Sequence, residues 1–162
     1  MLKNVWVFTF VLLFVLGCAI KPHINFSQTY KIIIKTKDIA IADGGFVRKA
    51  QGYKSIEIFS AGVLALHVEL AKLACLNGSC TTRDDFNRRF FGYKHYDKIL
   101  DDILDKKAIY GGVDKIKTKD GFRQNIKAKR YDILYKVSKN SIYFKDKKNH
   151  ILIKLIRLKG DS

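Results

Sequence analysis

The sequence predicts an α+β fold, in which one large antiparallel sheet curls into an incomplete β-barrel and two short helices cover its open side. Segments with strand character stand on both sides of residues 82–107, where the apolar residues follow a helical period. The only proline, Pro22, precedes all of these segments and interrupts none of them. Because two helices cannot cover a large flat sheet, we expect the sheet to curl over them.

The first strand character begins at residue 30. Residues 30–43 read YKIIIKTKDIAIAD, a stretch rich in isoleucine, with lysines that discourage pairing with other chains. Gly44-Gly45 is expected to break this strand, and Phe46-Val47 to resume it.

The next two strands are joined by a turn at Ala61-Gly62. The first, residues 55–59, alternates and places its two isoleucines on one face. The second also alternates with period two, which predicts a half-buried strand. Its inward residues are expected to be Leu64, Leu66, Val68 and Leu70.

Two cysteines flank a short hairpin. Asn77-Gly78 is a strong signal for a two-residue loop, which would place Cys75 opposite Cys80 within reach of a disulfide. No histidine lies near them to complete a metal site, and four residues separate them, unlike a redox CxxC motif. We therefore expect a structural disulfide.

Two helices should follow. Thr82, with Asp85 three residues later, indicates a helix start, and Phe86 and Phe90 share one face of that helix. A second helix is expected from Asp97. Its aspartates lie along a helix rather than in a calcium-binding loop, so we expect a solvated acidic face. Its apolar stripe is Ile99, Leu100, Ile103 and Leu104.

The remaining chain returns to strands. We expect strands over residues 121–126 and 131–137, then a hairpin of residues 141–145 and 150–158. The last strand, ILIKLIRL, is apolar on nearly both faces. It therefore needs cover on two sides, or an apolar cavity on one of them.

The formal net charge of the 162 residues is +16. The cations are spread along the chain and no nucleic-acid-binding motif is present, so we expect no nucleic-acid partner. A solvated basic surface with some attraction to anionic lipid or lipopolysaccharide is expected instead. The four histidines are scattered and no nucleophile motif occurs. These absences favour a binding protein without cofactor, metal or catalytic residues.

The amino terminus has the layout of a secretory signal. Lys3 precedes an apolar run over residues 5–16. The following Leu16-Gly17-Cys18 resembles the lipobox of bacterial lipoproteins. This resemblance implies removal of residues 1–17 and lipidation of Cys18, and three acyl chains would hold the protein on a membrane. The alternative is a simple N-terminal anchor with an incidental cysteine.

Three segments follow from the lipobox: a lipoprotein signal peptide over residues 1–17, a tether over 18–29 and a folded domain over 30–162. The residue after Cys18 is not the aspartate that retains lipoproteins at the inner membrane in the best-studied sorting rule. We therefore expect the outer membrane of a Gram-negative bacterium, with the domain facing the periplasm.

The expected helix YDKILDDILDKKAIY is followed by the segment GFRQNIKAKRYDILYKV. This segment is similar to the pattern F.Q.GW.V.Y of the LolA/LolB-like family of lipoprotein carriers and receptors, with Phe122, Gln124, Tyr131, Ile133 and Tyr135 at the corresponding places. The resemblance covers residues 40–158 in the order of elements and is sharp only over residues 122–135. The mature chain lacks the family's tryptophan and its proline before the closing strands, and the cysteine hairpin is not part of the pattern.

The resemblance implies an incomplete barrel whose apolar interior accepts acyl chains of lipoproteins from a periplasmic carrier and delivers them to the outer membrane. The turn after Phe59 is the nearest candidate for a membrane-inserting loop. The alternatives are a packed core in place of a cavity, and an assembly or scaffold lipoprotein that binds a β-barrel partner or lipopolysaccharide through its basic surface. The implied cavity residues are Ile58, Leu66, Val68, Ile133, Tyr135 and Phe144, with Leu100 and Ile103 as a helical lid.

Overall fold

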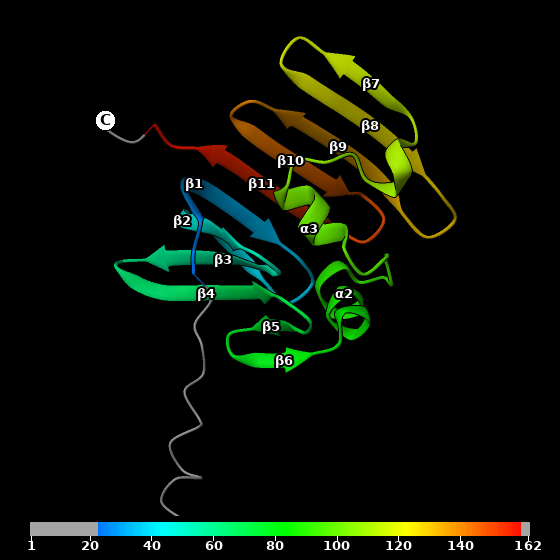
Figure 1. Cartoon of the computed structure of the whole chain (residues 1–162). Coiled ribbons are helices and arrows are strands. Elements are labelled where there is room, and N and C mark those ends of the chain that lie inside the picture. Colours follow the sequence, from blue (N-terminus) through cyan, green and yellow to red (C-terminus); the bar gives the residue numbers. More distant parts are fainter. Residues whose placement is uncertain (1–22, 160–162) are drawn as a thin grey trace, which may run out of the picture.

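The computed structural model describes residues 23–159 and shows one antiparallel sheet of 11 strands with two short helices (Figure 1). Cys18 and the expected signal peptide lie outside the described residues. The strands are β1 (Phe26–Lys35), β2 (Ala40–Ala50), β3 (Tyr53–Ser60), β4 (Val63–Leu70), β5 (Ala74–Leu76), β6 (Ser79–Thr81), β7 (Lys115–Thr118), β8 (Gly121–Lys127), β9 (Asp132–Ser138), β10 (Ser141–Asp146) and β11 (Ile151–Arg157). The helices are α2 (Arg83–Phe91) and α3 (Ile99–Leu104), followed by the 3-10 turn η1 (Tyr110–Gly112).

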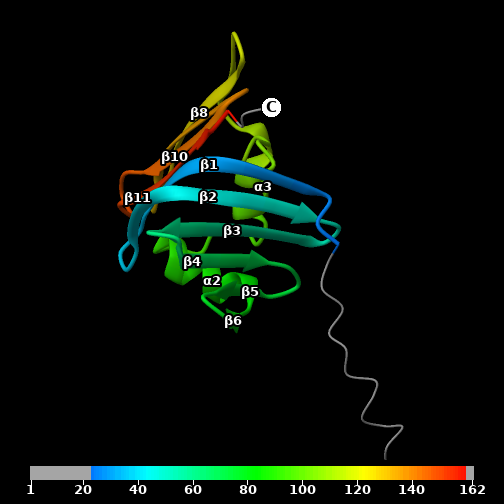
Figure 2. The same cartoon turned by 90° about the vertical axis from the view of Figure 1, so that its left-hand side faces the viewer.

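The strand order is β6-β5-β4-β3-β2-β1-β11-β10-β9-β8-β7, so two meanders meet where β1 pairs with β11. β6 and β7 are the free edges, and the sheet is therefore an open barrel rather than a closed one. Figure 2 shows α2 and α3 behind β1–β4, on one side of the curled sheet. The predicted α+β fold, a curled antiparallel sheet with two short helices on its open side, is confirmed.

The side of the sheet that faces the helices, here the inner face, forms the core. β11 lies at the centre of the sheet between β1 and β10, which explains its nearly all-apolar sequence. On the inner face Ile151, Ile153 and Leu155 are fully buried, whereas Leu152 and Ile156 are half-buried on the outer face. β11 was expected to be covered on both faces, but only its inner face is fully covered.

The expected break at Gly44-Gly45 is wrong, because β2 runs through both residues. The chain reverses earlier, between β1 and β2. There the Thr36 hydroxyl oxygen accepts hydrogen bonds from the backbone N–H groups of Asp38 (3.2 Å) and Ile39 (3.0 Å). A threonine side chain thus closes this turn, a signal that is weaker in a sequence than a pair of glycines.

The two glycines have different surroundings within β2. A Cβ at Gly45 would lie 2.2 Å from the Glu57 carbonyl oxygen and 3.0 Å from Cδ1 of Ile32, whereas nothing lies within 4 Å of a Cβ at Gly44. Gly45 therefore allows close approach of β2 to β3 inside the sheet, one of the reasons for which glycine occurs within strands.

The expected start of the folded domain at residue 30 is also wrong, because β1 begins at Phe26. Phe26 pairs with Lys49 and Gln28 with Val47, so part of the expected tether belongs to the sheet. Phe26 is 44% exposed, and this first part of β1 lacks the burial pattern that marks the rest of the strand.

The alternation expected for β4 holds for its last three inward residues and fails at the first. Leu66 pairs with Ile58 on the inner face, but the register shifts between Ile58 and Phe59, and Leu64 pairs with Phe59. Leu64 is consequently 47% exposed. A β-bulge of this kind inserts one residue and turns the next side chain to the other face.

Both predicted helices form and their apolar stripes are buried, although α3 begins at Ile99 rather than at Asp97. The sequence analysis did not identify β7, the edge strand that pairs with β8. All four residues of β7 are exposed, so this strand has no burial period from which it could be recognised.

Candidate functional site

All eight residues implied as an acyl-chain cavity lie together in one core cluster. Each exposes between 0 and 4% of its surface, so in this conformation these side chains pack against one another rather than line an open space. They come from β3, β4, α3, β9 and β10. The residues are Ile58, Leu66, Val68, Leu100, Ile103, Ile133, Tyr135 and Phe144.

A chain of aromatic rings, here called the aromatic path, crosses this core from α2 to β8. Successive ring centroids are 5.1, 5.1, 5.7, 6.3 and 5.6 Å apart, within the range of favourable aromatic contacts. The path therefore joins the helix to the inner face of the sheet by direct ring contacts. The rings, in order, are Phe86, Phe90, Phe91, Phe144, Tyr135 and Phe122.

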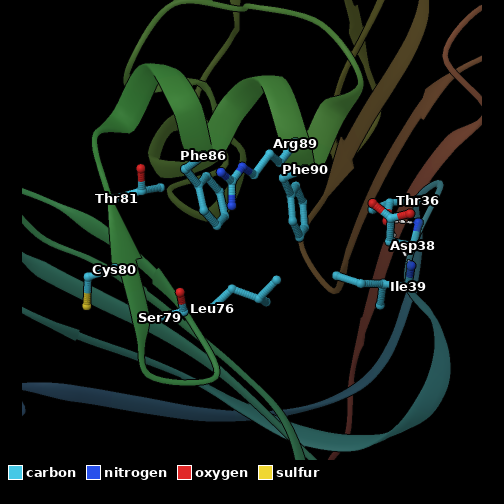
Figure 3. Close-up of a pocket in the computed structure, with 10 residues that line it drawn as sticks. All are labelled: Thr36, Asp38, Ile39, Leu76, Ser79, Cys80, Thr81, Phe86, Arg89 and Phe90. Carbon is cyan, nitrogen blue, oxygen red and sulfur yellow. Dashed lines mark hydrogen bonds between the residues drawn. The ribbon is translucent and has the colours of Figure 1, made fainter.

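The aromatic path starts in a pocket of about 490 Å³ beside α2, here called the α2 pocket. In Figure 3, Phe86 and Phe90 point from the helix toward Leu76 and Ile39 on the opposite wall. A volume of this size falls in the range of ligand pockets, roughly 300–1,000 Å³. The lining residues are Thr36, Asp38, Ile39, Leu76, Ser79, Cys80, Thr81, Phe86, Arg89 and Phe90.

Local sequence fixes the position of α2. The Thr82 hydroxyl accepts a hydrogen bond from the Asp85 backbone N–H at 3.2 Å and donates one to the Asp85 carboxylate at 2.9 Å, so the expected helix start is confirmed. Gly92 ends the helix in the left-handed conformation, with φ of 69°. These two signals limit α2 to nine residues, within which Phe86 and Phe90 lie about one turn apart on one face.

The opposite wall of the α2 pocket is the β5–β6 hairpin. Cys75 and Cys80 are directly opposite in the register and form a disulfide, so that prediction is confirmed. Asn77 and Gly78 both have positive φ, 49° and 82°, as a two-residue hairpin loop requires. The disulfide closes a hairpin of only three residues per strand, which would otherwise be marginal in stability.

Ion pairs hold α3 against the sheet. Lys54 of β3 lies 3.2 Å from Asp101 and 3.4 Å from Asp105, and Lys49 of β2 lies 3.0 Å from Asp105. Arg83 of α2 also pairs with Asp101. The expected solvated acidic face is therefore wrong for these two aspartates, since most of the cations that neutralise them come from elements distant in the sequence.

Burial opposes the ionisation of Asp105, but hydrogen bonds from Lys49 and Lys107 outweigh it and lower the pKa of Asp105. The Lys49 ammonium also donates to the Leu104 carbonyl at 2.8 Å, at the end of α3 where backbone carbonyls lack helical partners. These charged contacts attach the helical lid to β2 and β3 in addition to its buried apolar stripe.

Three of the five residues assigned from the family pattern, Phe122, Gln124 and Tyr131, make contacts within the fold. Phe122 is in the aromatic path, and Tyr131 stacks on Tyr110 with centroids 5.1 Å apart. Gln124 is fully buried. Its side-chain oxygen accepts from the Ile109 backbone N–H at 2.9 Å, and its amide donates to the carbonyls of Ile109 (3.0 Å) and Val113 (2.6 Å). Gln124 therefore fixes the segment that follows α3.

A buried histidine that the sequence did not single out lies beside this segment. His95 is 2% exposed, and its Nδ1 shares a hydrogen bond with the Tyr110 hydroxyl. The rings of Phe91 and Tyr131 pack around it. Burial lowers the pKa of His95 to about 4, so the ring is neutral at pH 7. Nothing in the local sequence distinguishes His95 from the exposed histidines.

The turn between β3 and β4 projects apolar side chains into solvent. Val63 is 69% exposed and Leu64 47% exposed, beside Ala61 and Gly62 with positive φ. This is the turn after Phe59 that the sequence singled out. No helix among residues 23–159 is long and apolar enough to cross a membrane. Nor do the described residues hold a group of three or more His, Cys, Asp or Glu side chains suited to a metal ion.

Comparisons of this chain with models of known protein families, with curated proteins and with solved structures found no match.

Proposed function

We propose that this protein is a lipid-anchored membrane protein that binds acyl chains of other lipoproteins and inserts them into the outer membrane. The observation that carries the proposal is the aromatic path. The α2 pocket opens on Phe86 and Phe90, and their rings lead through direct contacts to the inner face of a half-open barrel.

Entry of an acyl chain requires the helices to move away from the sheet. α2 has only nine residues and α3 only six, so this movement would separate a limited part of the core, and the ligand must compensate for the contacts that are lost. Each methylene that enters contributes about 0.8 kcal/mol. Ten methylenes would thus supply about 8 kcal/mol, enough to offset the loss of the ring contacts that they replace.

Two polar side chains are placed to orient the lipidated end of a ligand. Arg89 lies at the rim of the α2 pocket, is exposed, and forms no ion pair with any residue from 23 to 159. Its guanidinium is available to donate to the ester and amide carbonyls of a lipidated amino terminus. Deeper in the core, the Tyr135 hydroxyl is buried without a partner among those residues, and burial raises the pKa of this phenol.

Release into a membrane is supported by the β3–β4 turn. Exposed Val63 and Leu64 give this turn an apolar tip, which favours insertion among lipid chains over contact with water. Attachment through a lipid on Cys18 would keep this tip near the bilayer, and that attachment rests on the lipobox resemblance alone.

The direct test is photocrosslinking of the full-length protein with a triacylated lipopeptide that carries a diazirine near the end of one acyl chain. Mass spectrometry is expected to locate the label on α2, α3 and the inner face, with competition by unlabelled lipopeptide and none by the unacylated peptide. Label confined to the outer face of the sheet would contradict the proposal.

A matched pair of variants tests the orientation at the rim. Arg89→Gln should weaken lipopeptide binding about 3- to 10-fold, the effect of one or two lost hydrogen bonds. Arg88→Gln is the control, because Arg88 is adjacent and also exposed but pairs with Asp85 and does not line the pocket. Equal binding by both variants would remove Arg89 from the site.

Depletion in the native host tests the biological role. Other lipoproteins are expected to accumulate in the periplasm or the inner membrane when the protein is depleted. Normal localisation of lipoproteins, together with a defect in lipopolysaccharide or in β-barrel assembly, would instead support a scaffold lipoprotein.

A further inference from the structure

The outer face of the carboxyl-terminal half of the sheet carries cations from five adjacent strands. Each of these residues alternates with buried residues of the inner face, so its side chain points away from the helices. Figure 2 shows this part of the sheet, β8, β10 and β11, nearly edge-on at the left. We call the set the basic outer face: Lys31, Lys35, Arg123, Lys127, Lys136, Lys145 and Lys154.

The strand register brings three of these cations into one row. Lys154 of β11 is opposite Tyr143 of β10, Tyr143 is opposite Lys136 of β9, and Lys136 is opposite Arg123 of β8. Neighbouring strands are about 4.8 Å apart, so Lys136 and Arg123 are direct cross-strand neighbours. Like charges directly opposite one another destabilise a sheet.

No acidic side chain among residues 23–159 forms an ion pair with any member of the basic outer face. Asp132 is the only acidic residue that β7–β11 place on this side. Asp146 points inward, where it accepts hydrogen bonds from the backbone N–H groups of Asp132 and Lys148. This contrasts with Lys49 and Lys54, which aspartates of α3 neutralise.

The arrangement of the charges identifies the kind of partner. Residues on one face of a strand are about 6 to 7 Å apart, and neighbouring strands are about 5 Å apart. Cations on five adjacent strands therefore cover an area about 20 Å wide instead of following a groove. Proteins bind single-stranded nucleic acids in grooves lined by aromatic side chains on which the bases stack. On this face, β7–β11 place only one aromatic residue, the half-buried Tyr143, so such a platform is missing from these strands. A membrane surface presents anionic groups over an area.

The residues between the cations support the same assignment. Ile33, Leu134, Leu152 and Ile156 are half-buried on this face and provide apolar surface for the lysine stems. The ammonium groups then project beyond the aliphatic layer. Neighbouring cations, such as Lys136 and Arg123, lie within about a Debye length of each other, so they act jointly on an anionic surface.

We propose that the basic outer face docks on the surface of a bilayer that contains anionic phospholipid. Such a surface would supply the negative charge that the protein itself does not place opposite Lys136 and Arg123. This inference concerns the side of the sheet opposite the α2 pocket and does not depend on acyl-chain binding.

The experiment measures binding of the full-length protein to phosphatidylcholine vesicles with and without phosphatidylglycerol, at several salt concentrations. The measured quantity is the gain in affinity that phosphatidylglycerol produces. The amino terminus is the same in every variant, so its contribution cancels between variants. The wild-type gain is expected to decrease as salt increases.

Lys136→Gln/Lys154→Gln should reduce the gain roughly 30-fold, because each cation near an anionic surface contributes a factor of roughly five. The control is Lys72→Gln/Lys98→Gln, which removes the same charge from two exposed lysines, at the β4–β5 turn and the start of α3. This control should change the gain roughly twofold or less. Equal losses in the two double variants would overturn the proposal.

Lys136→Glu separates binding from folding. The substitution places an opposite charge beside Arg123, so the thermal midpoint of the variant should equal or exceed that of the wild type. The gain in affinity from phosphatidylglycerol should nevertheless be lost. A gain that survives this variant would overturn the proposal. So would tighter binding to duplex DNA than to phosphatidylglycerol vesicles at equal salt, or a larger gain from lipopolysaccharide than from phosphatidylglycerol.

Discussion

Replacing Gln124 by leucine tests how the chain after α3 is held in place. Gln124 is fully buried, and its side chain makes three hydrogen bonds to backbone groups, two with Ile109 and one with Val113. Leucine keeps most of the volume but leaves one N–H and two carbonyl groups without these partners. The segment that follows α3 would then lose its attachment to β8.

The magnitude follows from the three contacts. Each hydrogen bond contributes about 1 kcal/mol net, so Gln124→Leu should lower the free energy of unfolding by about 3 kcal/mol. For a domain of this size, about 3 °C of midpoint corresponds to 1 kcal/mol, which gives a decrease of about 10 °C. Urea unfolding and thermal unfolding, followed by circular dichroism, measure the two quantities.

The control is Asn125→Leu on the same strand. Asn125 is exposed on the outer face, and its side chain makes no hydrogen bond with any residue from 23 to 159, so the change should stay within about 0.5 kcal/mol. A loss below about 1 kcal/mol for Gln124→Leu would refute the argument, because it would mean that water or other groups satisfy the backbone equally well.

Three further predictions concern the sheet, the hairpin and the buried histidine. Gly45→Ala should destabilise the protein by about 2 kcal/mol in urea unfolding, because the new Cβ would lie 2.2 Å from the Glu57 carbonyl oxygen. Gly44→Ala is the control and should be nearly neutral, because nothing lies within 4 Å of a Cβ there. Equal effects of the two substitutions would contradict the close approach of β2 and β3. Reduction of the β5–β6 disulfide should lower the free energy of unfolding by about 2 kcal/mol, the value expected for a disulfide that closes a short loop. An unchanged urea midpoint in the presence of reductant would contradict this prediction. Burial lowers the pKa of His95 from 6.5 to about 4, so between these pH values the unfolded state binds more protons than the folded state. The free energy of unfolding should therefore be highest above pH 6.5 and should decrease by about 3 kcal/mol as the pH falls toward 4. His95→Gln should remove this part of the pH dependence; an identical pH profile would show that His95 does not cause it.

The sequence by itself determined the local features of this protein. The hairpin at Asn77-Gly78 with its disulfide, the helix start at Thr82 and the buried stripe of α3 all depend on residues within a few positions of one another. Turn chemistry, helix capping and helical period are local, and each therefore predicts its element without knowledge of the rest of the chain.

Tertiary structure decided the features that depend on distant neighbours. Gly45 lies inside a strand because of Glu57 on the next strand, and Leu64 faces outward because of a bulge against Phe59. The strand β7 had no signal of its own, since the pattern that identifies a strand is burial and all four of its residues are exposed. Only its pairing with β8 makes it part of the sheet.

The same distinction applies to the candidate sites. Alternation in the sequence identified Leu66 as inward-facing, and the family resemblance implied an interior position for Tyr135; both residues are buried. Only the fold could connect Phe86 to Phe144 through a chain of rings, or place Lys136 beside Arg123 without an acidic partner. The physical reason is that a local period fixes which face a side chain takes, whereas the pairing of strands decides which side chains share that face.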